Sequence, residues 1–489
     1  MLTDSFEKLN GIRFVEWLRA YLRSPWHPTV IAALMIASEL FSLELPVFYV
    51  YLAFGILIVL FERDTLPLVP VIACCYMTIS AKNNPGKFTD TIFSSPSFRI
   101  QLLLIIVVAV ALLIVRMVSF LVRNPKRKYL PEMTFGFAAL SAAYLLGGAF
   151  SGFYGGRTVL FGLAQIGSLA FAYFYFIYTI DWATVPKNYL MSIFLTIGVG
   201  VAVQTIGMYA LPGVIGENGV NRSAMYTGWG IYNNVGSVMT MCVPAPFYFA
   251  ARRKEGWTFS MLGVAFYLAV LLSQSRTAML FGSIVFAACV VIVLVKTKSI
   301  ERWKHVVVYA SFLVVGVVCA VVFRQKLQSL FRSIIDIGTN PFGRPMIWKA
   351  CLKKFVQFPI FGVGFYETPG GLLYNGGIAD LAPCPPDVFI PPRAHNTYCQ
   401  LLASGGLFAI TAYGVHRAET ITTLFLRPTT EKVFASLCIC ALVLTSLLDC
   451  HFFNFGPAIL YSILLALSEG ENRRDGVRGS LLFRRRFRT

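Results

Sequence analysis

Charged side chains are scarce in this sequence: Asp, Glu, Lys and Arg together make up 13% of its 489 residues, against 57% hydrophobic residues. That balance is too apolar for an ordinary soluble domain. Acidic residues are fewer than basic ones, 23 against 42, and the formal net charge is +19. The basic residues stand in short clusters between apolar stretches and form no soluble basic region. This distribution argues against a nucleic-acid partner.

The apolar stretches also lack the alternating polarity of β-barrel strands, and they recur along the chain at lengths that cross a hydrocarbon core of ~30 Å as helices. The sequence therefore predicts an all-α polytopic membrane protein with about twelve to fourteen transmembrane helices. Fourteen spans are expected, at residues 28–43, 46–61, 66–81, 99–122, 134–155, 157–180, 187–212, 232–251, 258–273, 279–295, 305–323, 397–416, 433–448 and 456–468.

Residues 1–27 lack the uninterrupted apolar core of a cleaved signal peptide and mix charged with aromatic residues. We expect them to form an amphipathic helix on the inner membrane surface. The remaining divisions are N-terminal transmembrane helices over 28–186, a transmembrane catalytic core over 187–468, and a basic cytoplasmic tail over 469–489 that contacts anionic lipid.

Lys and Arg fix the predicted orientation, because they concentrate in the short segments that an N-terminus-inside arrangement places in the cytoplasm. Both termini are then cytoplasmic. Four segments face out under this topology: loops 213–231 and 324–394, and the turns at 273–276 and 449–453.

Several signatures of chemistry are missing as well. No nucleotide-binding fingerprint, metal-ligand spacing or Ser-His-acid arrangement stands out, so we predict neither cofactor nor metal. An external enzyme without nucleotide needs a substrate activated beforehand, such as a lipid-linked pyrophosphate. The eleven cysteines lie mostly within apolar stretches, where Cys acts as a small hydrophobe. Cys351 and Cys384 share the long external loop, and a disulfide between them stays open.

The most informative segment is loop 324–394, which contains GRPMIWKACLKKFVQFPIFGVGF. A helix is expected from Gly343 to Phe358, with Arg344 and Trp348 on one face and Lys349, Lys353 and Lys354 on the other. Pro359 should end this helix, and Gly362 and Gly364 permit a tight turn after it. One interpretation is an amphipathic helix on the outer leaflet. The other is that Arg344 holds a diphosphate, since a guanidinium forms paired hydrogen bonds to phosphate oxygens.

Two more residues could join Arg344. Arg276, in SQSRTAML at the outer edge, is either a side chain that reaches lipid headgroups or a second phosphate ligand. His395 lies in Ala394-His395-Asn396, where the long loop re-enters the membrane. It is either a hydrogen-bonded interfacial residue or the group that exchanges a proton with a sugar hydroxyl.

Weaker candidates complete the set. His451, in Asp449-Cys450-His451, is interpreted as structural, because an Asp at i−2 does not share a helical face with it. Loop 213–231 offers Glu217 and Arg222. Asn233 and Asn234 follow at the start of the next span, and helix capping is their default role, with binding of substrate hydroxyls as the alternative.

Together these segments resemble the O-antigen ligase/O-antigen polymerase superfamily of bacterial membrane glycosyltransferases. The resemblance covers roughly residues 190–420 and rests on the order GWGIYNNVGS, SQSRTAML, GRPMIW…FPIFGVGF and AHNTYCQLLASGG. It implies an inverting transferase, without nucleotide or metal, that uses an undecaprenyl-pyrophosphate-linked glycan as donor and a glycan or lipid-glycan as acceptor. It maps the two functional arginines of the family onto Arg276 and Arg344, and its histidine onto His395. We add Arg222, Asn234, Trp348 and Asn396 as candidate substrate contacts.

The resemblance also implies an extracytoplasmic active site in the bacterial cytoplasmic membrane. The larger helix count favours a polymerase, whose acceptor is another lipid-linked repeat unit, over a ligase that transfers the glycan to a lipid or other surface acceptor. A lipid-linked oligosaccharide flippase is the rival from another class, and a non-catalytic scaffold is a third. The absence of an obvious internal repeat and the one-sided placement of the candidate charges favour an enzyme.

Overall fold

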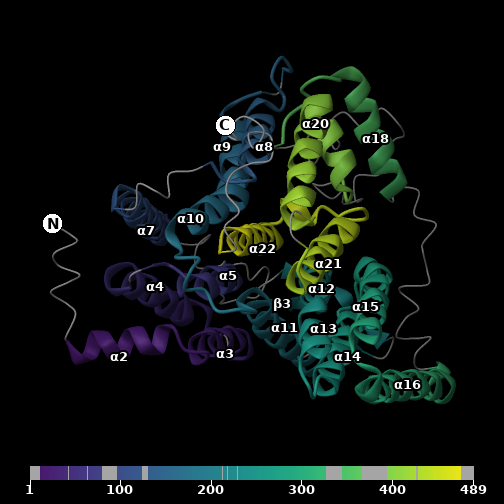
Figure 1. Ribbon diagram of the computed structural model, residues 1–489. Coiled ribbons are helices and arrows are strands. Elements are labelled where there is room, and N and C mark those ends of the chain that lie inside the picture. The colour runs from purple at the N-terminus through teal and green to yellow at the C-terminus, as the bar shows by residue number, and fades with distance from the viewer. Residues whose placement is uncertain are drawn as a thin grey trace, which may run out of the picture. The chain divides into compact units, whose positions relative to one another are not determined.

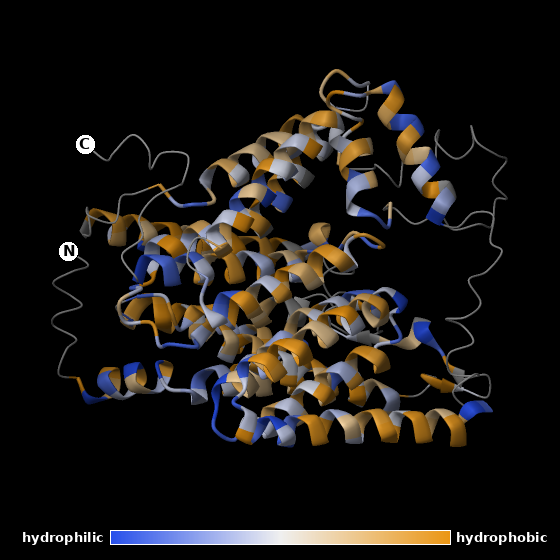
Figure 2. Cartoon of the chain, turned by 45° about the vertical axis from the view of Figure 1, so that its right-hand side comes forward, coloured by the Kyte–Doolittle hydropathy of each residue, from blue (hydrophilic) through white to orange (hydrophobic). Residues whose placement is uncertain are grey.

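The computed structural model describes residues 12–41, 43–62, 64–79, 96–123, 130–152, 154–211, 213–216, 219–227, 230–325, 344–365, 394–425 and 428–474. These residues are helical apart from turns, connecting segments and two small hairpins, in which strands β1 (Ile215–Gly216) and β2 (Gly219–Val220), and β3 (Tyr226–Thr227) and β4 (Gly230–Ile231), pair in antiparallel fashion. Apolar residues cover most of the helices, and polar residues gather at helix ends and connections (Figure 2). The all-α prediction is confirmed.

The chain divides into two compact units. Unit 1 comprises residues 1–128 and 175–330. Its helices are α2 (Arg13–Leu22), α3 (Trp26–Leu40), α4 (Glu44–Phe61), α5 (Leu68–Ile79), α7 (Pro96–Arg123), α11 (Tyr189–Gly207), α12 (Tyr232–Cys242), α13 (Pro244–Arg252), α14 (Trp257–Leu272), α15 (Arg276–Lys296) and α16 (Ser299–Val322), with 3-10 turns η3 (Met208–Ala210) and η4 (Arg222–Ala224) (Figure 1).

Unit 2 comprises residues 129–174 and 331–489. Helix α10 (Ala172–Thr179) crosses the boundary between the units. The other elements of unit 2 are α8 (Thr134–Leu146), α9 (Gly156–Ile166), the π-helical turn η2 (Gly167–Phe171), α18 (Arg344–Gln357), α20 (Thr397–Phe425), α21 (Thr430–Thr445), the 3-10 turn η6 (His451–Phe453) and α22 (Phe455–Arg474).

Seven helical segments of the described chain are long and apolar enough to cross a membrane: 44–61, 100–122, 158–179, 189–210, 276–296, 299–322 and 397–425. Helices 134–146 and 257–272 are apolar but shorter. The chain is therefore a multi-pass membrane protein, while the predicted count of twelve to fourteen spans stays a prediction.

Three of the expected spans are shortened or interrupted at a proline or glycine in the structure. The span at 134–155 ends at Leu146, because Gly148 takes a φ of 85° and breaks the helix. The span at 232–251 consists of α12 and α13, which are interrupted where Pro244 removes a backbone donor. The span at 397–416 extends to Phe425 and is broken inside.

Helix α20 folds back on itself at Gly406, whose φ of 61° and ψ of −153° are non-helical. The rings of Tyr398 and Tyr413 lie 5.7 Å apart, centroid to centroid. In a straight helix, 15 residues would separate them by about 22 Å along the axis. The two halves, 397–405 and 407–425, therefore lie side by side, close to α8 and α18 (Figure 1).

The segment Pro359–Phe365 stabilises this break from outside the helix. The N–H groups of Val363 and Gly364 donate to the carbonyls of Ala403 and Ser404, at 2.9 and 2.8 Å. The N–H groups that open the second half, on residues 407 and 408, donate to the carbonyls of residues 359 and 360. These four bonds thus satisfy part of the backbone groups that the break leaves unpaired.

Candidate active site

His395 stands in a short connection before α20 with a left-handed φ of 50°, a strained conformation for a residue with a side chain. Asn396 fixes the backbone beside it. Its Oδ1 accepts from the N–H of Tyr398 at 2.9 Å and from that of Cys399 at 3.0 Å, so it caps the first turn of α20. Its Nδ2 donates to the Leu447 carbonyl at 2.8 Å. The bonds of Asn396 therefore fix the backbone on the C-terminal side of His395.

The His395 side chain pairs with Asp449, a residue 54 positions later in the chain. Nδ1 lies 3.2 Å from Oδ1 of Asp449, and the two side chains are 21% and 8% exposed. The same oxygen accepts from the N–H of Cys450 at 2.8 Å, and Nε2 of His451 lies 4.0 Å from the other oxygen.

Burial alone would raise the pKa of Asp449, but favourable electrostatic interactions with His451 and His395 and the hydrogen bonds from His395 and Cys450 outweigh it and hold this pKa well below its usual range. The carboxylate is therefore ionised at neutral pH. An ionised partner on Nδ1 orients the imidazole and leaves Nε2 as the nitrogen that can take a proton.

Asp449 is a candidate site residue that sequence reasoning missed. His451 was interpreted as structural because Asp449 does not share a helical face with it, and no spacing rule connects residue 395 to residue 449. The only signal was that both stand in segments predicted to face out.

Helix α18 brings Arg344 to the same neighbourhood. The indole N–H of Trp348 donates to the carbonyl of Ala394, the residue before His395, at 2.9 Å. The N–H of Ala394 donates in turn to Oε1 of Gln400 at 3.1 Å. Arg344 is half-buried and lies one helical turn before Trp348, so the two share a face.

The predicted helix and turn in this segment are confirmed. Helix α18 runs from Arg344 to Gln357, and Gly362 and Gly364 follow with φ of 63° and 101°. Arg344, Trp348, His395 and Asn396 thus all belong to unit 2, where Trp348 contacts the residue before His395.

The remaining candidates belong to unit 1. Arg276 is half-buried and is the first residue of α15, after the N-cap Ser275, whose hydroxyl accepts from Ala278 N at 3.3 Å. The guanidinium of Arg222 lies 4.3 Å from the ring centroid of Tyr232. His395 belongs to unit 2, so the meeting of Arg276, Arg222 and Asn234 with it in one site stays a prediction.

One lesser expectation is contradicted. The capping role of Asn233 and Asn234 is wrong: both lie inside the first turn of α12, whose N-cap is Ile231.

Cys351 is a buried free thiol, and its suggested partner Cys384 lies outside the described residues, as does Glu217. Within the described ranges, no three His, Cys, Asp or Glu side chains are grouped so as to hold a metal ion.

These features define an all-α multi-pass membrane protein with an imidazole–carboxylate pair beside an arginine-bearing helix. Comparison with protein families then finds that residues 247–414 match the family model described as O-Antigen ligase. The matched range contains Arg276, Arg344 and His395. Over these residues it confirms the resemblance to the O-antigen ligase/O-antigen polymerase superfamily. No curated protein matches the chain.

Proposed function

We propose that this protein is an inverting glycosyltransferase that joins a polyprenyl-pyrophosphate-linked glycan to an acceptor sugar on the outer face of the membrane. The observation that carries the proposal is the His395–Asp449 pair. Trp348, on the Arg344 face of α18, contacts the residue before His395.

The reaction is a single displacement. The acceptor hydroxyl attacks the anomeric carbon of the donor, its proton passes to Nε2 of His395, and the bond from that carbon to the pyrophosphate oxygen breaks. The leaving pyrophosphate keeps the bonding electrons, so negative charge grows on it, and a fixed guanidinium at Arg344 stabilises that charge. Arg276 supplies a second guanidinium in the proposed site.

A surface-polysaccharide polymerase is the form of this function that we favour, and the description of the matched family supports a ligase as the alternative. The two differ in acceptor. Purified protein in liposomes, given only the undecaprenyl-pyrophosphate-linked repeat unit, should produce a ladder of longer lipid-linked glycans. A ligase would leave that donor unchanged until a distinct acceptor is added, and an absence of glycan transfer with every acceptor tested would reject both.

Replacing Arg344 with alanine should lower the transfer rate about 100-fold, because removing one fixed donor to a developing anion typically costs that much. Arg344→Lys should recover only part of the rate, since an ammonium lacks the forked geometry. Lys349→Ala is the matched control, an exposed cation on the same helix whose removal should leave the rate within about twofold. Equal rates for Arg344→Ala and Lys349→Ala would remove Arg344 from the site.

A further inference from the structure

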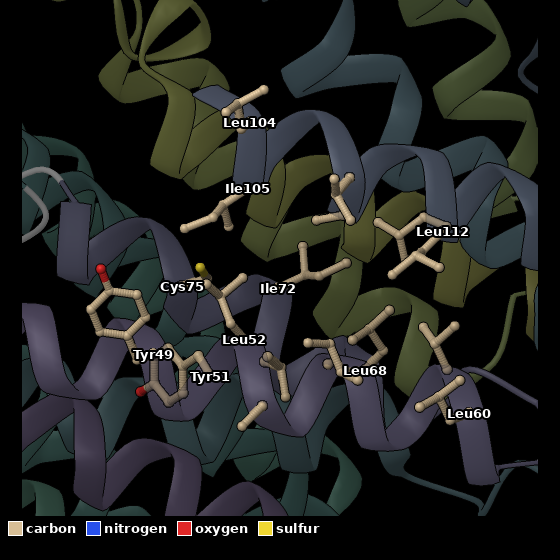
Figure 3. A pocket seen from close by; sticks show the side chains of 18 residues that line it. Tyr49, Tyr51, Leu52, Leu60, Leu68, Ile72, Cys75, Leu104, Ile105 and Leu112 are labelled. Atoms are coloured by element: carbon tan, nitrogen blue, oxygen red, sulfur yellow. The ribbon is translucent and has the colours of Figure 1, made fainter. Parts of the chain in front are cut away.

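A cavity of about 620 Å³ lies in unit 1 between α4, α5 and α7 (Figure 3). Its walls are almost wholly apolar, and Leu52, Ile72, Ile105 and Leu112 are among the side chains that line it. Tyr51 also lines it, but its hydroxyl donates to the Ile31 carbonyl at 2.7 Å. A buried water needs two to four polar partners, and a sugar needs more, so this lining suits neither.

The cavity has the depth of one leaflet. Tyr49 and Leu104 stand at one end, and Leu60 and Leu112 at the other (Figure 3). Eleven residues of α4 separate Tyr49 from Leu60, which is about 16 Å of helix. Half of a hydrocarbon core of ~30 Å is about the same length.

The Leu60 end of the cavity lies beside a polar belt at the end of α4. Arg19 Nε donates to the Phe61 carbonyl at 2.7 Å, Arg23 pairs with Glu62 at 3.0 Å, and Arg116 donates to the Glu62 carbonyl. Arg19 belongs to α2, an amphipathic helix on which Phe14 and Trp17 are 56% and 63% exposed. Aromatic and basic side chains together are typical of a membrane–water interface.

We propose that this cavity binds one acyl chain of a bilayer phospholipid from the leaflet on which α2 lies. The slot begins beneath the polar belt, where a headgroup would sit, and continues for the length of one chain into the hydrocarbon. The bound acyl chain would also support α7, because only 6% of the apolar stretch of this helix is buried in the protein. This site is independent of the transferase proposal.

Native mass spectrometry of the full-length protein in mild detergent tests the slot, with dioleoyl phosphatidylglycerol as the added lipid. Ala109 lines the cavity from α7, whereas Ala111 is exposed on the same helix and does not. Wild type and Ala111→Trp should retain one phospholipid, and Ala109→Trp should retain at least tenfold less. Ile72→Trp, which fills the slot from α5, should repeat the loss in a protein that stays monodisperse.

Equal retention by Ala109→Trp and Ala111→Trp would overturn the proposal. So would displacement of the phospholipid by equimolar undecaprenyl phosphate, because that result would make the slot a site for the isoprenoid chain.

A second inference rests on a different observation, the environment of Arg417 in α20. Its guanidinium lies 4.5, 4.9 and 5.0 Å from the ring centroids of Tyr413, Phe452 and Tyr461, and it donates to the Tyr461 hydroxyl at 2.9 Å. Among the residues that the structure describes, no carboxylate forms an ion pair with it. Arg417 is half-buried. A cation that loses water to surrounding rings without gaining a counter-ion adds little stability, and an apolar residue of similar size is often as stable or more so.

The rings around Arg417 connect the two segments that carry the proposed catalytic pair. The Tyr413 ring contacts that of Tyr398, three residues after His395, at 5.7 Å. It also contacts that of Phe452, three residues after Asp449, at 5.4 Å. Resting on the proposed function, we infer that Arg417 is a positioning residue, which holds His395 and Asp449 in register through these rings.

A double-mutant cycle tests this role, with kcat and KM measured on radiolabelled donor. Arg417→Met should lower kcat about tenfold in the wild-type background with the donor KM unchanged. In the Asp449→Asn background the same substitution should lower kcat less than twofold, because the alignment of His395 with the Asp449 carboxylate, which Arg417 maintains, no longer exists. The thermal midpoint of the Arg417→Met variant should stay at or above that of the wild type.

Equal losses of kcat in both backgrounds, or a loss that follows the thermal midpoint, would overturn the inference about Arg417. A wild-type protein that transfers no glycan would instead reject the proposed function, so the two failures are distinguishable.

Discussion

Transfer should fall by about 1,000-fold when His395 is replaced with alanine, within the range of 10²–10⁴ that a positioned general base contributes. The acceptor hydroxyl is a weak nucleophile, and its proton must leave as the new bond forms. Nδ1 of His395 is engaged by Asp449 at 3.2 Å, so Nε2 is the nitrogen that receives the proton. The measurement is single-turnover transfer from radiolabelled donor in liposomes, at equal amounts of folded protein.

His395→Gln separates a base from a group that only positions the acceptor. A glutamine amide retains hydrogen bonding but does not accept a proton near pH 7. If His395 is the base, the glutamine variant should be as slow as the alanine variant. A glutamine variant within about fivefold of the wild-type rate would instead assign His395 a positioning role.

Local signals made part of the candidate site predictable. Arg344 and Trp348 are four residues apart, and this spacing alone places them on one helical face. The helix must end before Pro359, and the chain can turn at Gly362 and Gly364. In the structure α18 ends at Gln357, and both glycines have a positive φ. Each of these features depends on residues within a few positions of one another.

Long-range features were not predictable in the same way. The contact of His395 with Asp449 depends on how α20 and α21 pack, and no periodicity encodes it. Hydropathy treats 397–416 as one continuous span, although the chain folds back at Gly406 inside it. The expected span ends at residue 416 and leaves Arg417 outside it, whereas Arg417 lies within α20 beside the rings of Tyr413, Phe452 and Tyr461.

The fold-back at Gly406 leads to the second large expected effect, on stability. Its φ of 61° with ψ of −153° is a conformation that only glycine adopts readily. A Cβ there would lie 2.5 Å from the carbonyl carbon and oxygen of Ile360 and from the oxygen of Pro359. The two oxygens already accept from the N–H groups of residues 407 and 408, so these carbonyls cannot move aside without breaking those bonds.

Gly406→Ala should therefore destabilise unit 2 by about 3 kcal/mol or more, from backbone strain and overpacking together. Gly414→Ala, on the same helix, is the matched control, because an added Cβ there meets no atom within 4 Å. It should leave the thermal midpoint unchanged or raise it, since alanine favours a helix by up to about 1 kcal/mol over glycine. Thermal unfolding in detergent, followed by the loss of the monodisperse peak, compares the two. Equal thermal midpoints for the two variants would mean that α20 is straight at residue 406. A straight helix would separate Tyr398 from Tyr413, and the placement of His395 depends on the contact between these two rings.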